Sequence, residues 1–235
     1  MNILITGATK GIGRAIAEKM VELGHNVAVC ARNAADLSAL EEALRSSNSS
    51  VQVFAKAVDL SEKEQVYNFA DQALDFFGTI EVLVNNAGLF LPSFVLDEAD
   101  DSLEKQLQLN LLAPYYLYKK LAPSMRNQRK GHIFNICSVS SKEININAGS
   151  YGVTKAALLS LNHVMRAEMM ACNVKVTAIL PGSTFTHSWE GAQIPKDRFI
   201  QAEDVAETIS GVLSLSNSVN VEEILMKPLH GQIGG

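Results

Sequence analysis

Short apolar runs alternate along almost the whole chain with segments whose apolar residues recur every three or four positions. The runs predict buried strands, and the periodic segments predict amphipathic helices. Strands are expected at residues 2–6, 25–31, 51–58, 80–84, 132–137, 174–180 and 222–229. Helices are expected at about residues 15–23, 33–45, 61–77, 102–128, 151–172 and 202–213, with Pro114 as a kink or boundary in the fourth.

Nearly continuous apolar strands that alternate with helices are typical of a parallel sheet covered on both faces. The sequence therefore predicts an α/β fold, a doubly wound, Rossmann-like parallel sheet of about seven strands with helices on both faces. No linker, repeat or low-complexity stretch interrupts the 235 residues, so a single domain is expected over residues 1–235.

Composition narrows the possible partners. The net charge of −5 and the absence of a basic run argue against a nucleic-acid partner. No apolar stretch reaches the ~18 residues of a membrane span, and no leader precedes the first strand, so a cytoplasmic protein is expected. Cys30, Cys137 and Cys172 occur singly, without the spacing of metal ligands. They are interpreted as reduced, buried thiols, and no metal site is expected.

The first strand leads into the glycine-rich segment 7–13 and then into a helical pattern that stops at Gly24. Gly7, Gly11 and Gly13 let the backbone turn tightly and approach a ligand closely. The start of the following helix presents free N–H groups and a positive dipole end, which suits a pyrophosphate. Strand, glycine turn and helix in this order are the context in which such a segment binds a dinucleotide.

Tyr151 and Lys155 are four residues apart, so their side chains share one face of a helix. Ser138 closes the buried strand that precedes them. A phenol, an ammonium group and a hydroxyl that converge can donate a proton to a carbonyl oxygen, acidify the donor and hold the oxygen. A tyrosine and a lysine at this spacing are usually only an exposed helix pair, so the interpretation depends on the rest of the chain.

Polar or turn-forming residues stand at or just past the ends of six predicted strands. They are Gly7, Arg32, Asp59, Asn85, Ser138 and Pro181. A turn or a helix cap would explain any one of them. In an open α/β sheet, however, ligands bind at the carboxyl ends of the strands. Their coincidence at one edge favours a ligand site there.

With these motifs the sequence resembles the short-chain dehydrogenase/reductase family over nearly its whole length. Three segments match family motifs: the cofactor turn at 6–13, the motif that braces the sheet beside the cofactor at 85–88, and the segment that holds the nicotinamide carboxamide at 181–186. Four single residues match the family's catalytic tetrad: Asn110, Ser138, Tyr151 and Lys155.

The resemblance implies a role for each residue. Tyr151 is expected to exchange a proton with the substrate oxygen, and Ser138 to polarise that oxygen. Lys155 is expected to lower the pKa of the tyrosine and bind the nicotinamide ribose, while Asn110 holds a water that relays protons from the lysine. The expected cofactor-binding residues are Gly7, Thr9, Lys10, Gly11, Ile12, Gly13, Arg32, Asp59, Leu60, Asn86, Ala87, Gly88, Tyr151, Lys155, Pro181, Gly182, Thr184 and Thr186.

The end of the second predicted strand discriminates between NAD and NADP. An NAD site usually has an Asp or Glu there, about twenty residues after the glycines. Here Ala31 is followed at once by Arg32. The guanidinium group suits a 2′-phosphate, and Lys10 can bring a second positive charge to it. NADP(H) is therefore expected to be preferred over NAD(H).

The resemblance implies an NADP-dependent oxidoreductase of the carbonyl reductase type, similar to sepiapterin reductases, that acts on a small carbonyl or secondary alcohol. A 3-oxoacyl-[acyl-carrier-protein] reductase is the alternative, although segment 188–202 is short for an acyl-chain lid. A regulator that binds NADP without catalysis would be expected to lack one residue of the tetrad, and all four are present. The physiological substrate and direction stay open.

Several other residues carry expectations. Tyr115, Tyr116 and Tyr118 are expected to pack, His163 to be a surface or interface histidine, and Glu222 and Glu223 to be solvated or capping charges. His187 and Trp189 are candidates for the substrate pocket. Surplus apolar residues on the helices at 102–128 and 151–172, which the family pairs across a two-fold axis, predict a homodimer or homotetramer. Those residues are Tyr115, Tyr116, Leu117, Leu158, Leu161 and Met165.

Overall fold

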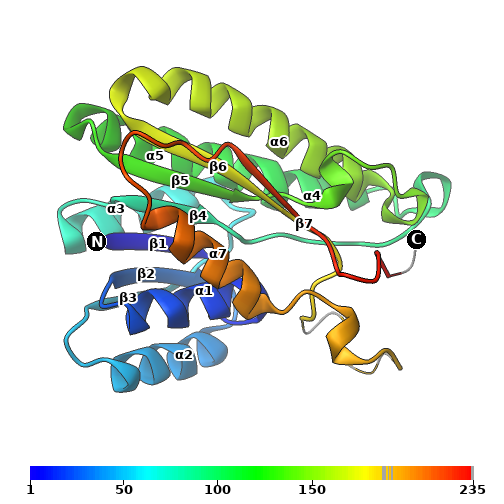
Figure 1. Cartoon of the computed structure of the whole chain (residues 1–235), viewed down its shortest axis with the longest axis horizontal. Helices are drawn as coiled ribbons and strands as arrows, with labels where there is room; N and C mark the ends of the chain where they lie inside the picture. The colour runs from blue at the N-terminus through cyan, green and yellow to red at the C-terminus, as the bar shows by residue number, and fades with distance from the viewer. Residues whose placement is uncertain (187–188, 190, 192, 234–235) are drawn as a thin grey trace.

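The computed structural model describes residues 1–186, 189, 191 and 193–233, and within them the chain forms a seven-stranded sheet (Figure 1). Every pair of neighbouring strands is parallel, and the strand order is β3-β2-β1-β4-β5-β6-β7. The strands are β1 (Asn2–Thr6), β2 (Asn26–Ala31), β3 (Val53–Ala57), β4 (Val82–Asn85), β5 (Gly131–Ile136), β6 (Val174–Pro181) and β7 (Glu223–Met226). The predicted doubly wound sheet is confirmed.

Helices cover both faces of this sheet (Figure 1). One face is packed by α1 (Gly11–Glu22), α2 (Ala34–Ser47) and α7 (Ala202–Leu213), and the other by α3 (Lys63–Phe77), α5 (Ala113–Gln128) and α6 (Ser150–Met169). Successive strand residues point to opposite faces, so Ile3 and Ile5 join the first core and Leu4 joins the second. Each strand contributes side chains to the cores on both faces of the sheet, which explains why the strands are apolar at nearly every position.

The predicted long helix at 102–128 is divided. It consists of α4 (Ser102–Leu107), one turn of π-helix (η2, Gln108–Leu112) and α5. Pro114 lies in the first turn of α5, directly after the π turn in which the Ala113 N–H donates to the Gln108 carbonyl oxygen. The expected boundary at Pro114 is therefore confirmed, and the π turn just before it was not predicted.

Strand β7 is shorter than predicted, since residues 227–229 do not pair with β6. Glu223, expected to be solvated or capping, is instead partly buried, with its carboxylate bound by Lys142 and His163. This pairing lowers the pKa of the Glu223 carboxyl. Glu222 is exposed and pairs with Arg166 at 3.3 Å. The wrong expectation for Glu223 has a simple cause, because its partners come from distant segments of the chain.

Three of the six apolar residues predicted to be surplus belong to the core. Leu117, Leu158 and Met165 are at most 1% exposed. Tyr118 is also buried, and its hydroxyl donates to Glu168 at 2.5 Å. Of the three tyrosines, Tyr115 is the most open, at 40% exposed. The helix surfaces are therefore less apolar than the sequence suggested.

The three cysteines are free thiols. Cys30 and Cys137 are buried as predicted, and burial raises the pKa of both thiols to about 12. Cys172 is only partly buried, contrary to expectation, because it lies in the short 3-10 turn that follows α6. Among the described residues, no helix is both long and apolar enough to cross a membrane. No group of three His, Cys, Asp or Glu side chains within the described part of the chain is arranged to hold a metal ion.

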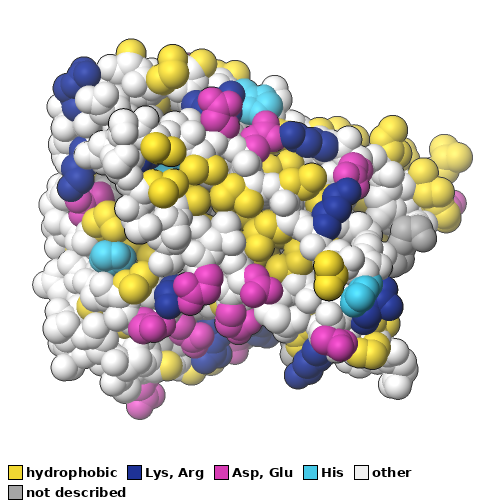
Figure 2. All heavy atoms as spheres, in the orientation of Figure 1, with side chains coloured by type: hydrophobic (Ala, Val, Ile, Leu, Met, Phe, Trp, Pro, Cys, Tyr) yellow, Lys and Arg dark blue, Asp and Glu magenta, His cyan; other side chains and the backbone are white. Residues whose placement is uncertain are grey.

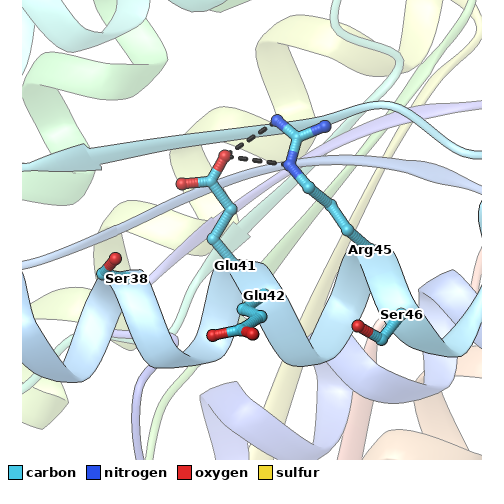
Figure 3. A pocket seen from close by; sticks show the side chains of 5 residues that line it. All are labelled: Ser38, Glu41, Glu42, Arg45 and Ser46. Atoms are coloured by element: carbon cyan, nitrogen blue, oxygen red, sulfur yellow. Dashed lines mark hydrogen bonds and ion pairs between the residues drawn. The ribbon is translucent and has the colours of Figure 1, made fainter.

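Helix α2 is tied to the sheet through Arg45, whose guanidinium donates to the Val53 carbonyl oxygen at 2.6 Å and pairs with Glu41 at 2.8 Å. Figure 3 shows this pair in a shallow hollow on the helix, lined by Ser38, Glu41, Glu42, Arg45 and Ser46. Arg45 lies in the last turn of α2, at the end of the helix that points away from the carboxyl ends of the strands. We therefore assign this hollow a structural role.

A buried histidine joins strands β5 and β6. His132 Nε2 lies 2.8 Å from Thr177 Oγ1, and that hydroxyl donates to the Val221 carbonyl oxygen at 2.6 Å. Because the hydroxyl proton goes to Val221, Nε2 must be the protonated nitrogen of a neutral imidazole. Burial, helped by the charge of Lys175, lowers the pKa of His132 to about 3.

We expect acid to destabilise the fold through His132. The unfolded imidazole takes up a proton below about pH 6.5, whereas the folded one stays neutral down to about 3, so stability is lost as the pH falls through this window. Between about pH 6.5 and 4 the free energy of unfolding should fall by roughly 3 kcal/mol more in the wild type than in His132→Asn. Urea unfolding at both pH values measures the difference, and parallel pH dependence in the two proteins would contradict it.

Candidate active site

The residues predicted from the strand ends meet at one edge of the sheet, on the right of Figure 1. All strands are parallel, so the segments that follow β1, β4, β5 and β6 emerge on the same side. The sheet order reverses between β1 and β4, the place where open α/β sheets bind ligands.

The glycine turn after β1 is packed too tightly for side chains. Gly7 has φ +65°, and a Cβ added there would lie 2.9 Å from Ala87 Cα. A Cβ on Gly13 would overlap the carbonyl oxygen of Gly7. Gly11 has φ +53°, and its Cβ would lie 3.0 Å from the Thr186 methyl carbon. The turn is thus closed on one side by the segment after β4 and approached by the segment after β6.

Asn86 and Thr6 hold the turn in place. Asn86 Nδ2 donates to the carbonyl oxygens of Thr6 and Gly7, at 2.9 and 3.1 Å. Thr6 Oγ1 accepts from the backbone N–H groups of Asn86 and Ala87, both at 3.0 Å. These bonds join the turn after β1 to the segment after β4, and none of them involves an N–H group of helix α1. Its N-cap residue Lys10 makes no side-chain cap bond and its first turn has no acid, so the helix start is suited to an anion.

Ser138, Tyr151 and Lys155 come together at the end of β5. Ser138 caps a 3-10 turn (η3, Val139–Ser141), accepts from Ser140 N at 3.1 Å and is close enough to the Tyr151 phenol to lower its pKa. Lys155 Nζ donates to the Ile136 carbonyl oxygen at 2.8 Å and lies 5.8 Å from the centre of the Tyr151 ring. A hydroxyl, a phenol and an ammonium group therefore share one small volume, as the sequence predicted.

Gly88 brings this group next to the segment after β4. A Cβ on Gly88 would lie 3.5 Å from Lys155 Nζ and 3.3 Å from Asn110 Oδ1. Asn110 lies in the π turn and is fully buried. Its amide bonds Leu89 N at 2.7 Å, the Leu89 carbonyl oxygen at 2.9 Å and Thr154 Oγ1 at 3.0 Å. All four tetrad residues are therefore grouped, and the side chain of Asn110 is engaged with protein.

Burial pushes the pKa values of Tyr151 and Lys155 in opposite directions. It raises the pKa of the Tyr151 phenol to about 12, against the lowering effect of the Ser138 hydrogen bond. It lowers the pKa of the Lys155 ammonium to about 8. The expected lowering of the tyrosine pKa by Lys155 is thus not found in the chain by itself, because desolvation of the phenol dominates.

The two basic residues predicted to bind a 2′-phosphate, Arg32 and Lys10, have different surroundings. Arg32 is exposed directly after the strand. Hydrogen bonds from Ser61 lower the pKa of Asp59, and the charge of Arg32 adds a smaller contribution in the same direction. Lys10 Nζ lies 3.5 Å from Asp36 Oδ2, a partner that sequence reasoning missed. To bind a phosphate, Lys10 would therefore have to leave its ion pair with Asp36.

The segment after β6 is hydrogen-bonded to Gln232, a partner that no sequence pattern indicated. Ser183 N and Ser183 Oγ both donate to Gln232 Oε1, at 2.8 and 2.9 Å. A Cβ on Gly182 would overlap the same Gln232 amide. Thr184 Oγ1 donates back to the Gly182 carbonyl oxygen at 3.0 Å. The C-terminal segment therefore packs against residues that were predicted to hold a nicotinamide.

The two substrate-pocket candidates have separate outcomes. Trp189 packs its ring against Phe199, with ring centroids 5.0 Å apart. His187 lies outside the described residues. The pocket role of both residues stays a prediction.

Comparison with known proteins identifies the family. A family model described as short chain dehydrogenase matches residues 1–195. The chain belongs to the short-chain dehydrogenases. An uncharacterized oxidoreductase of Staphylococcus aureus is 33% identical to this dehydrogenase over 227 residues, 96% of each chain. One from Staphylococcus saprophyticus is 30% identical over 226 residues, again 96% of each.

Solved structures are similar to this short-chain dehydrogenase along its whole length. An alcohol dehydrogenase from the archaeon Thermococcus sibiricus, complexed with 5-hydroxy-NADP, has a TM-score of 0.90 and 26% identity, covering 100% of this chain and 99% of its own. An L-sorbose reductase from Gluconobacter frateurii, complexed with NADPH and L-sorbose, also scores 0.90 with 26% identity, covering 100% and 97%.

The buried lysine of this dehydrogenase should cost stability at neutral pH. The folded pKa of about 8 lies below the ordinary 10.5, so the unfolded state holds the proton more tightly, and the penalty is relieved as the pH rises from about 8 to 10.5. The stability gained by Lys155→Met relative to wild type should therefore be roughly 2–3 kcal/mol larger at about pH 7 than at about pH 10. Urea unfolding at the two pH values tests this, and an equal difference at both would disprove it.

Proposed function

We propose that this chain is an NADP(H)-dependent oxidoreductase that interconverts a carbonyl and a secondary alcohol. Residues 1–235 would form one unit that binds both cofactor and substrate, and the protein would work in the cytoplasm. The observation that carries the proposal is the grouping of Ser138, Tyr151 and Lys155 beside Gly88, at the sheet edge that also holds the glycine turn. A proton donor and an anion-binding turn at one edge are what a reductase needs.

In reduction, the Tyr151 hydroxyl gives its proton to the substrate oxygen, and Ser138 donates a second hydrogen bond to that oxygen. The bound nicotinamide cofactor would supply the hydride for the carbonyl carbon. Lys155, already desolvated, stabilises the phenolate left on Tyr151. Asn110 braces the segment that carries Gly88, and the water relay beside it stays part of this proposal.

The cofactor fits the cradle formed by the glycines. Gly7, Gly11 and Gly13 let the turn pack directly against its protein neighbours, where a Cβ would not fit, and the start of α1 offers free N–H groups to a pyrophosphate. The residues proposed to hold the cofactor follow the sheet edge from the adenine end to the nicotinamide end: Arg32, Asp59, Leu60, Gly7, Thr9, Lys10, Gly11, Ile12, Gly13, Asn86, Ala87, Gly88, Tyr151, Lys155, Pro181, Gly182, Thr184 and Thr186.

NADP(H) is proposed over NAD(H) because of the charges around the end of β2. Ala31 offers no carboxylate to the ribose, and Arg32 is exposed directly after it. The structural relatives from Thermococcus sibiricus and Gluconobacter frateurii were solved with an NADP derivative and with NADPH. Their agreement with the charge pattern of this chain supports the preference.

The loops around the proposed site favour an apolar substrate. Exposed apolar side chains gather on the loops that follow β4, β5 and β7, which Figure 2 shows as yellow surface on the right of the molecule. They include Leu96 and Ile144, both 96% exposed, and Leu229, 93% exposed. Because an acyl chain would also suit this surface, 3-oxoacyl-[acyl-carrier-protein] reduction is kept as the second candidate. A panel of ketones, diketones, pterins and acetoacetyl thioesters, followed by nicotinamide absorbance, distinguishes the candidates.

A homodimer or homotetramer is also proposed, through the outer surface of α6. Val153 and Val164 are 58% and 51% exposed there, and Tyr115 on α5 is 40% exposed. Apolar side chains left open on helices that already pack against a sheet are typical of a subunit contact.

Tyr151→Phe should abolish turnover and leave NADPH affinity nearly unchanged, because only the transferable proton is lost. Lys155→Ala should impair both, since its ammonium serves the tyrosine and the cofactor. Steady-state rates and fluorescence titration with NADPH measure the two effects. If Tyr151→Phe keeps a tenth or more of the wild-type rate, Tyr151 is not the proton donor.

The wild type should bind NADPH about a hundredfold more tightly than NADH, because two charge-assisted contacts are each worth roughly 1.5–3 kcal/mol. Arg32→Ala should lose most of this preference. Arg126→Ala, which removes the same charge from the exposed end of α5, is the control and should keep it. Equal affinities of the wild type for the two cofactors would sink the assignment.

Light scattering at micromolar concentration should give at least twice the 25.5 kDa mass of the chain. Combining Val153→Asp with Val164→Asp should shift the protein toward the monomer. Leu215→Asp, which places the same charge at an exposed apolar position after α7, should not. A stable wild-type monomer would contradict the proposed assembly.

A further inference from the structure

Two buried amides, one helical turn apart, make the same pattern of bonds beside the proposed active site. Gln106 in α4 is fully buried, accepts from Leu91 N at 3.3 Å and donates to Ser150 Oγ at 2.7 Å. Asn110, four residues later, bonds the backbone of Leu89 and the hydroxyl of Thr154. Each amide thus joins the loop after β4 to helix α6. Only Asn110 was predicted from the sequence.

On α6, both anchored hydroxyls stand next to a residue of the proposed site. Ser150 immediately precedes Tyr151, and Thr154 immediately precedes Lys155. Thr154 Oγ1 also donates to the carbonyl oxygen of Tyr151 at 2.8 Å. The two amides therefore fix the first turns of α6 at the residues from which the phenol and the ammonium group project.

On the loop, the two anchored residues flank an aromatic ring. Leu89 and Leu91 stand on either side of Phe90, whose ring meets the Tyr151 ring edge-on with centroids 4.7 Å apart. Holding the backbone on both sides of Phe90 limits how far its ring can move from the tyrosine. Phe90 in turn helps to exclude water from the phenol, whose pKa burial raises.

A third connection reaches the same point of α6. Glu98, farther along the loop, accepts from Ser150 N at 2.5 Å. Helix α6 has no side-chain cap of its own, because its N-cap residue is Gly149. Ser150 therefore receives both a carboxylate at its N–H and an amide at its hydroxyl, and both come from residues 98–106 of the chain.

We propose that Gln106 is a positioning residue that holds Phe90 and the start of α6 in register, so that Tyr151 keeps one orientation toward the substrate. The inference rests on the proposed function, in which Tyr151 is the proton donor. Glutamine suits the position because a single side chain must accept from Leu91 and donate to Ser150 while buried. Leucine has a similar volume and supplies neither bond.

The first experiment compares Gln106→Leu with a matched control. Thr177→Val also removes buried hydrogen bonds, but in the His132 chain near the opposite end of β5. Gln106→Leu should lower kcat by about tenfold to a hundredfold, because small misplacements of a reacting group cost this much. Its Kd for NADPH should stay within about threefold of the wild type. Thr177→Val should keep kcat within about twofold of the wild type, even if its thermal stability falls as much as that of Gln106→Leu.

The second experiment tests whether Gln106 acts through Phe90. Phe90→Leu and the double variant Phe90→Leu with Gln106→Leu complete a double-mutant cycle on kcat. The double variant should lose little more than the worse of the two single variants. The pH at which the rate of alcohol oxidation rises should also fall in Gln106→Leu, because water then reaches the phenol. Additive losses in the cycle, or an unchanged pH profile, would overturn the positioning role.

A third readout does not depend on turnover. Hydrogen exchange, followed by mass spectrometry, should quicken in segments 89–101 and 149–155 of Gln106→Leu and stay unchanged there in Thr177→Val. Unchanged exchange in Gln106→Leu would refute the inference even if the enzyme were active. By contrast, full activity of Tyr151→Phe would refute the proposed function and leave the exchange result standing, so the two failures can be told apart.

Discussion

The candidate site depends on how closely the turn after β1 approaches the segment after β4. Thr6 and Asn86 satisfy each other's backbone groups, and Gly7, which has no Cβ, both adopts a positive φ and lets the turn pack directly against Ala87. β1 and β4 are neighbours at the point where the sheet order reverses, so the chain leaves them on opposite sides. The polar groups of the two segments are thereby used on one another, and the N–H groups of α1 are left for a ligand.

The same burial acts on Tyr151 and Lys155 with opposite sign. It disfavours the charged form of each, raising the pKa of the phenol to about 12 and lowering that of the ammonium to about 8. A reaction that takes a proton from the phenol creates a negative charge where water is scarce. The nearby cation is then worth far more than at the surface, because attraction between charges strengthens as the dielectric constant falls. The burial that disfavours the charged forms of Tyr151 and Lys155 before the reaction therefore also strengthens the attraction between the ammonium group and the phenolate during it.

Sequence alone predicted what is repeated or local. The succession of strands and helices followed from alternating apolar runs, and the group Ser138, Tyr151 and Lys155 followed from a strand end and one helical turn. What escaped prediction depends on contacts between distant segments. Glu223 was expected to be solvated because nothing near it in the chain announces Lys142 or His163. Gln106 and Gln232 are single amides without a pattern, and their partners lie 44 and 49 residues away. The raised pKa of Tyr151 depends on enclosure, which no spacing encodes.

Glu98 and Gly149 have a consequence for changing what this protein accepts as substrate. A Cβ on Gly149 would overlap the Glu98 carboxylate and lie 2.6 Å from the Ser93 carbonyl oxygen, and Gly149 has φ +52°. The loop after β4 and the entry to α6 therefore form one interlocking part, although they are distant in the chain. A loop transplanted from a relative would bring new apolar side chains to the site, yet without a matching residue 149 it would also unseat the helix. The two segments should be exchanged as a pair, because recognition and the frame of the reacting groups share the same contact.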